Sequence, residues 1–338
     1  MAVRDNPIMT RLTVALYALL AVILHSQAAM AEMSVITPPD RSVVTGEQLV
    51  LVLSLDGTRL GAVDIFVNNR RQKTVAVPQN KNVVCIDGIT LSTGYNSIKA
   101  VTTYEKKKVG ELNLTVLLST PLSPTWDSPP EGFKAYLFHG SANTKVCAPC
   151  HTIDFSTASD AAETGEKSPC YVCHKKLLSP YPVAHGPAAV WSCLTCHTSS
   201  PKKGKAGALT ANKRVCVECH DQPMSLWQSK KYIHGPLVDG DCVTCHNPHA
   251  SDFRSLLRLS AYDLCTSCHD QILLTPHVIS GFSERKGHPL RLPRDPLKPG
   301  SEFSCISCHN PHAGDSPFFL AHYKLETRDE YCRTCHFF

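Results

Sequence analysis

The chain has 338 residues, 43% hydrophobic and 19% charged, with a formal net charge of +5; this globular composition permits about two domains. A basic chain can bind nucleic acid, but Lys202, Lys203 and Lys205 lie in a Gly/Ala/Pro loop without aromatic residues, and the chain has no nucleic-acid motif, so we expect no nucleic-acid partner. The unusual counts are 17 Cys and 17 His, which indicate disulfides, metals or covalent cofactors.

Residues 1–31 have the pattern of a cleaved export signal. Arg4 and Arg11 form a positive end, the run at 12–24 (LTVALYALLAVIL) is apolar, and Ala29-Met30-Ala31 is a small-x-small cleavage site. The apolar run is too short to cross a bilayer comfortably, although an uncleaved anchor is the alternative. We expect a mature protein without a transmembrane segment, located in the periplasm or outside the cell.

Residues 32–119 alternate apolar and polar side chains in short runs, such as QLVLVLSL at 48–55 and ELNLTVLL at 111–118. Turn residues separate these runs at spacings near ten residues. This pattern predicts an antiparallel β-sandwich. Cys85 lies in one of the runs, and we expect it to be a small buried side chain.

The stretch ITLSTGYNSIKAVTTYEKKKVGELNLTVLL resembles the closing strands of bacterial immunoglobulin-like domains. The resemblance covers about 85 residues and implies an all-β immunoglobulin-like sandwich of a kind that mostly mediates contacts, although fold alone does not fix function. Residues 120–138 are Pro-rich, and we interpret them as a linker.

Eight Cys-x-x-Cys-His motifs occupy the remainder, 139–338. Their cysteines are Cys147, Cys150, Cys170, Cys173, Cys193, Cys196, Cys216, Cys219, Cys242, Cys245, Cys265, Cys268, Cys305, Cys308, Cys332 and Cys335. Their histidines are His151, His174, His197, His220, His246, His269, His309 and His336.

This motif is the attachment site of c-type haem, in which two thiols bind the porphyrin vinyl groups and the histidine ligates iron. Zinc ribbons do not require a histidine after each cysteine pair. A thioredoxin-like site needs one motif, and disulfides do not explain the adjacent histidines. The sequence therefore predicts eight covalently attached haem c groups.

The motifs belong to a repeat that is two motifs long. His139, His185 and His234 each lie eight residues before a motif cysteine, and His288 lies seventeen before Cys305, with LPRDPLKPG inserted. The chain thus contains four modules, each with an opening histidine and two motifs.

The segments CVTCHNPHA and CISCHNPHA resemble the multihaem c-type cytochromes with doubled CXXCH motifs, here an octahaem member, over about 139–338. This resemblance implies covalent haem, iron held mostly by two histidines, and electron transfer.

Eight further histidines in this region match the eight distal positions that full two-His coordination needs. They are His139, His185, His234, His249, His277, His288, His312 and His322. His249 follows His246 by three residues, and Pro248 redirects the chain, so we expect His249 to ligate a different haem from His246. His312 should do the same, and the first two modules have no counterpart of either.

The repeat region offers 25 residues per haem, too few to bury eight rings separately. We therefore expect the haems to pack on one another as the core, with short helices and loops around them.

The leading hypothesis is an exported octahaem electron carrier, not an enzyme, whose partners are other redox proteins such as cytochromes or an outer-membrane electron conduit. One alternative is an octahaem reductase of a nitrogen or sulfur oxyanion at a haem with an open axial position. All eight motifs end in His, which does not favour it. The other alternative is a subunit of a polymeric cytochrome filament, a homo-polymer in which ligands could pass between subunits.

Overall fold

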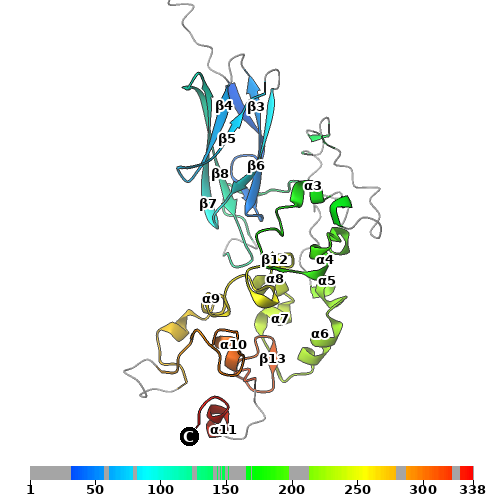
Figure 1. Cartoon of the computed structure of the whole chain (residues 1–338), viewed down its shortest axis with the longest axis vertical. Helices are drawn as coiled ribbons and strands as arrows, with labels where there is room; N and C mark the ends of the chain where they lie inside the picture. The colour runs from blue at the N-terminus through cyan, green and yellow to red at the C-terminus, as the bar shows by residue number, and fades with distance from the viewer. Residues whose placement is uncertain are drawn as a thin grey trace, which may run out of the picture. The chain divides into compact units, whose positions relative to one another are not determined.

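The computed structural model describes residues 32–56, 61–78, 82–123, 128–139, 165–168, 170–197, 213–278, 287–321 and 328–337, with residues 143, 145, 147, 148 and 151. The expected export signal, residues 1–31, lies outside the described residues. The chain divides into unit 1, residues 1–138, and unit 2, residues 139–338 (Figure 1). Within the described ranges, no helix has the length and apolar character needed to cross a membrane.

The described residues of unit 1 form nine β-strands in two sheets. The three-stranded sheet has the order β1-β3-β6, and the six-stranded sheet has the order β5-β4-β7-β8-β2-β9. The strands are β1 (Glu32–Thr37), β2 (Ser42–Val44), β3 (Gln48–Asp56), β4 (Ala62–Val67), β5 (Arg70–Ala76), β6 (Val83–Thr90), β7 (Gly94–Tyr104), β8 (Lys107–Leu118) and β9 (Lys134–Ala135).

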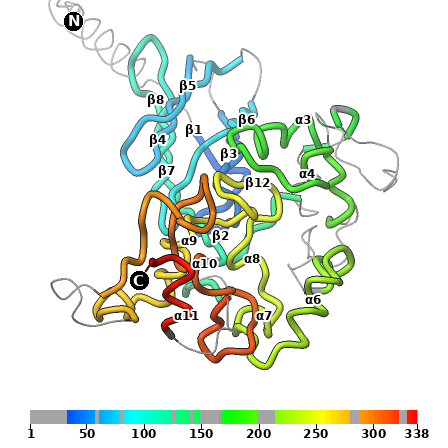
Figure 2. Tube along the Cα trace, turned by 60° about the horizontal axis from the view of Figure 1, so that its bottom comes forward, coloured from blue at the N-terminus to red at the C-terminus, as the bar shows by residue number. Residues whose placement is uncertain are grey.

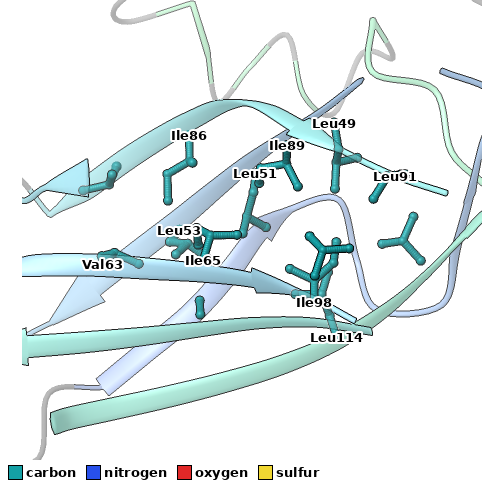
Figure 3. Packing of buried hydrophobic residues seen from close by; sticks show 14 of the residues in the cluster. Leu49, Leu51, Leu53, Val63, Ile65, Ile86, Ile89, Leu91, Ile98 and Leu114 are labelled. Atoms are coloured by element: carbon teal, nitrogen blue, oxygen red, sulfur yellow. The ribbon is translucent and has the colours of Figure 1, made fainter. Parts of the chain in front are cut away.

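Period-two alternation places one face of each long strand in a common core. The pairs β4–β5, β4–β7 and β7–β8 are antiparallel, whereas β2 pairs parallel with β8 and β9. Figure 3 shows side chains from both sheets, such as Leu51, Ile86 and Ile65, gathered in one cluster, and all three are fully buried. The strand-rich region is thus confirmed, and an immunoglobulin-like topology stays a prediction.

The expectation for Cys85 is wrong, because this side chain is exposed. Val84 and Ile86 on either side of it are buried in the core. Successive side chains of a strand point to opposite faces, so the residue between two buried positions faces outward. A run of apolar residues such as NVVCI does not reveal which of its members faces inward.

The Pro-rich segment 120–138 is tied to the sandwich near its end. Strand β9 pairs with β2, and the Tyr136 amide donates to the Val43 carbonyl at 2.9 Å. Residues 124–127 of this segment lie outside the described residues.

Unit 2 consists of short helices and loops that follow one another from α3 to α11 (Figure 1 and Figure 2). The α-helices are α3 (Tyr171–His174), α4 (Gly186–Ala189), α5 (Lys213–Val217), α6 (Asp221–Gln228), α7 (Gly235–Asp239), α8 (Cys242–Cys245), α9 (Ala261–Thr266), α10 (Cys305–Cys308) and α11 (Arg328–Arg333). Single 3₁₀ turns are η1 (Gly165–Lys167), η2 (Cys193–Thr195), η4 (Arg254–Leu256) and η5 (Asp270–Leu273). The expected low content of secondary structure is confirmed.

Two short antiparallel strand pairs connect segments from successive modules. Strand β10 (Val183–Ala184) pairs with β12 (Ala250–Ser251), and β11 (Tyr232–Ile233) pairs with β13 (Ala313–Gly314). Each pair joins the residues just before a module-opening histidine to those just after an Asn-Pro-His segment of the next module. These pairs therefore place the Asn-Pro-His histidines beside the preceding module.

Candidate haem-binding site

All eight motifs share one local backbone structure. In each, the amide of the motif histidine donates to the carbonyl of the first motif cysteine, with N···O distances of 2.9–3.0 Å. This i to i+4 bond closes one helical turn, which puts side chains three and four residues apart on the same side. Both thiols and the imidazole can therefore approach a single planar ring, as haem attachment requires.

The structure brings fourteen histidines together as seven pairs of rings. The pairs are His139–His174, His185–His220, His197–His249, His234–His269, His246–His312, His277–His309 and His288–His336. Their ring centroids are 5.9–6.2 Å apart. Every pair joins one motif histidine to one further histidine, which is the combination that the sequence predicted for proximal and distal ligands.

The spacing within these pairs fits a metal ion between two imidazoles. A histidine nitrogen binds a transition metal at about 2 Å, and the ring centroid lies about 1 Å behind that nitrogen, so two axial imidazoles have centroids about 6 Å apart. In the described part of the chain, no three His, Cys, Asp or Glu side chains form a compact metal centre. Two protein ligands per site suit an iron whose other four ligands are porphyrin nitrogens.

Backbone carbonyls fix the orientation of several of these rings. The Nδ1 atoms of His246 and His309 lie 2.7 and 2.6 Å from the Ser255 and Phe318 carbonyl oxygens. The Nδ1 atom of His185 lies 3.1 Å from the Pro248 oxygen. An Nδ1–H donated to a carbonyl leaves Nε2 unprotonated and able to ligate a metal.

Burial favours the neutral form of five of the further histidines by lowering their pKa values. Desolvation, reinforced by neighbouring histidines, lowers the pKa of both His249 and His312 to about 4. Burial likewise lowers the pKa values of His139, His234 and His277. A neutral imidazole is the form that binds metal.

A second backbone rule connects neighbouring modules. In each of the three later modules, the backbone amide of the opening histidine donates to the backbone carbonyl of another histidine. The ring of that other histidine faces the first motif histidine of the module. These bonds are His185 to His249 at 2.9 Å, His234 to His312 at 2.9 Å and His288 to His277 at 3.0 Å. The three later modules therefore position the partner of their first motif in the same way.

Motif cysteines lie near one another in sequence order. First cysteines of adjacent motifs are hydrogen-bonded between modules, in the pairs Cys170–Cys193, Cys216–Cys242 and Cys265–Cys305. Second cysteines lie close enough within modules to affect each other electrostatically, in the pairs Cys196–Cys219, Cys245–Cys268 and Cys308–Cys335. Burial together with these neighbours raises the pKa of the Cys193 thiol to about 11.

Some predicted residues stand apart from this arrangement. Cys150 and His322 lie outside the described residues. His249 faces His197 and not His246, the motif histidine three residues before it. His151 faces no histidine ring within the described ranges, although its backbone has the same turn as the other motifs.

Sequence reasoning missed Trp227, whose ring stacks on His312 with centroids 3.9 Å apart and planes 20° from parallel. This tryptophan lies on α6, well away from His312 in the sequence, and no local motif marks it. It packs against the face of the His312 ring and so holds that ring in place.

Comparison with known families gives one match. Residues 185–225, 234–272 and 296–337 match the family described as "Doubled CXXCH motif". No curated protein sequence matches the chain.

Three solved structures are each similar to about a quarter of the chain. A Jonesia denitrificans lytic polysaccharide monooxygenase is 16% identical over 24% of this chain and 60% of its own, with a TM-score of 0.22; the match thus spans less than two thirds of that protein. Fibronectin(III)-like modules of Clostridium thermocellum CbhA are 12% identical over 26% of this chain and 98% of theirs, with a TM-score of 0.22. CopC from Methylosinus trichosporium is 12% identical over 26% and 95%, also at 0.22. Similarity at this level carries no argument about function.

Proposed function

We propose that this chain, whose three doubled CXXCH regions indicate a multihaem c-type cytochrome with covalent haem c, carries eight haems and conducts electrons from one to the next. Haem c, once bound, supplies a one-electron iron couple. The protein's task is then to attach the haems, ligate their irons and hold them close together.

The seven histidine pairs are the observation that carries this proposal. Each would supply the proximal and distal ligands of one iron, with Nε2 of both rings directed at the metal. Two strong imidazole ligands that stay bound in both oxidation states change the iron geometry little, which suits electron transfer. They also leave no position for a substrate, so a conduit is favoured over catalysis at these seven sites.

The proximity of the motif cysteines supports an order for the haems. Because thioether sulfurs mark the edges of attached rings, neighbouring cysteines of adjacent motifs would bring the haem edges together in the order of the sequence. The first cysteines would link one module to the next, and the second cysteines would link the two haems of a module. The proposed path is therefore a single unbranched chain from the second motif to the eighth, with the first motif as its extension.

The amino-terminal sequence supports a location outside the cytoplasm. An export signal at residues 1–31 would deliver the protein to the periplasm or the cell exterior, where haem c is attached. Multihaem cytochromes usually exchange electrons with other redox proteins, and we propose cytochromes or an outer-membrane conduit as partners. Unit 1, with its own core and no motif, would dock the protein to such a partner or to the cell surface.

The test is a haem count combined with the spin states of the irons. Intact-mass measurement of the denatured, purified protein should show eight attached haems, and low-temperature EPR should show that at least seven are low-spin. A protein with fewer than seven haems, or with several high-spin irons, would overturn the proposal.

A further inference from the structure

We infer that the haem attached at the first motif, Cys147–His151, receives no second histidine from its own chain and binds a small exogenous ligand of iron at that position. This inference rests on the proposed function, because it concerns one of the eight proposed haems. It differs from the expectation that each of the eight further histidines ligates one of the eight irons.

The second motif of every module has the same kind of partner. The pairs His139–His174, His185–His220, His234–His269 and His288–His336 all join a module-opening histidine to the second motif of the same module. The rule holds in all four modules, so the four opening histidines are already committed.

The first motif histidines of the later modules take their partners from elsewhere in the chain. His197 of the second module faces His249, and His246 of the third faces His312. Each donor is the third residue after the first motif histidine of the following module. His309, in the last module, has no following module and faces His277 instead.

Neither source is available to the first module. The third residue after His197 is Ser200, where the next two modules have histidine. A substitute like His277, placed just before the opening histidine, is also missing, because residues 26–138 contain no histidine. A serine hydroxyl is a poor ligand for haem iron compared with imidazole.

His322 is the remaining histidine, and its neighbour in sequence is held at the other end of the haem series. The Ala321 amide donates to the Cys308 carbonyl at 2.8 Å, which fixes the chain beside the seventh motif. The third module has the same bond, from Arg258 to Cys245 at 2.9 Å. Ala321 thus lies beside the seventh motif, and five motifs separate that motif from the first.

Methionine offers no replacement within unit 2. Met224, the one methionine of this region, is buried in α6, and its amide donates to the His220 carbonyl at 3.3 Å beside the fourth motif. The side chain of His151 is exposed, and no described histidine ring faces it. The first haem is thus placed at one end of the chain of haems with one axial position for a small molecule.

The ligand class follows from haem chemistry. A ferrous haem with one imidazole binds neutral diatomic ligands such as CO, whereas a two-His haem does not bind them without losing a histidine. A ligand bound here would sit at the end of the proposed electron path.

The test is to introduce a histidine at position 200, where the later modules have a histidine. In the full mature protein, one haem in eight should be high-spin by EPR, and after reduction one in eight should bind CO. The triple variant Thr198→Asn, Ser199→Pro, Ser200→His recreates the Asn-Pro-His segment of the later modules. It should keep eight haems and lose both the high-spin signal and CO binding. The double variant Thr198→Asn, Ser199→Pro is the matched control and should keep both.

A second pair of variants does not depend on the graft. Removing Cys147 and Cys150 by substitution with Ala should abolish the high-spin signal and CO binding. Removing Cys332 and Cys335 in the same way should lose one low-spin haem and keep both signals.

Three results would overturn the inference. Eight low-spin haems in the unmodified protein would do so, and would leave the electron-conduit proposal intact. A new high-spin haem in His322→Ala would assign His322 as the ligand, from the same or another copy. Several high-spin haems in the unmodified protein would reject the proposed function itself.

Discussion

The two units of this chain differ in how many apolar side chains they bury. Among the described residues, unit 1 buries 21 apolar side chains and unit 2 buries eight, three of them alanines, although more of unit 2 is described. Unit 1 satisfies its backbone in two sheets and fills the space between them with Leu, Ile and Val. The described part of unit 2 has short helices, loops and seven spaced pairs of imidazoles. The difference indicates that a polypeptide which folds around porphyrins can leave most of its interior to them.

Loss of haem attachment should therefore cause a larger difference in stability between the two units than any substitution. When the full chain is produced without the haem-attachment machinery, we expect unit 2 to be digested rapidly by protease and unit 1 to survive. Unit 1 buries enough apolar surface to fold by itself, whereas unit 2 does not. Mass spectrometry of the resistant fragment measures the outcome. Equal resistance of both units would contradict the comparison.

A cavity in the sandwich should destabilise unit 1 without affecting the haems. Ile65→Ala removes a fully buried side chain and should lower the free energy of unfolding of unit 1 by about 2–5 kcal/mol. Val83→Ala, at a position that is 47% exposed, is the control and should change it by less than about 0.5 kcal/mol. Circular dichroism follows the unfolding of the strands and the Soret band follows the haems. A parallel shift in both signals would show that the units do not unfold independently.

Loss of one distal ligand should change one haem. His249→Ala removes the ring that faces His197 and should convert a single additional haem to high-spin, because the other pairs do not use His249. The EPR high-spin fraction should rise by about one part in eight while the haem count stays constant. Asp252→Ala, on the exposed surface close by, is the control. An unchanged spectrum would remove His249 from the ligand set.

Loss of the tryptophan contact should have the smallest effect. Trp227→Leu removes the ring that stacks on His312 but leaves the imidazole in place. Such a contact contributes about 0.5–1.5 kcal/mol, so we expect the His246–His312 haem to stay low-spin with a shifted reduction potential. Spectroelectrochemical titration against the unmodified protein measures the shift. Leu226→Ala, an exposed neighbour on the same helix, should leave the potentials unchanged.

The sequence predicted those features that depend on short spacings. Each Cys-x-x-Cys-His motif is five residues long, and one helical turn fixes its geometry, so candidate attachment sites could be proposed without a fold. The alternating strands of 32–119 were visible for the same reason, since the period of two is local.

The partners of the motif histidines could not be assigned from spacing. His197 and His249 are brought together by the β10–β12 pair, which joins segments of different modules. The sequence indicated only that His249 should serve a haem other than that of its neighbour His246. That His249 faces a motif histidine of the preceding module depends on strand pairs only two residues long. No periodicity in the sequence predicts such short pairs.

Cys85 and Trp227 illustrate two other limits. The apolar run that contains Cys85 has no polar residue to mark its outward face. The inward and outward positions of this strand were therefore assigned wrongly. Trp227 acts on His312 through a tertiary contact with no local sequence signal.

The most direct measurement is X-ray diffraction from the haem-loaded protein at the iron absorption edge. Anomalous scattering would locate each iron independently of any assumed ligand. The account predicts eight irons in the order of the motifs along the chain, seven of them each between the Nε2 atoms of one of the seven histidine pairs. Irons bound by other combinations, such as His246 with His249, would contradict it.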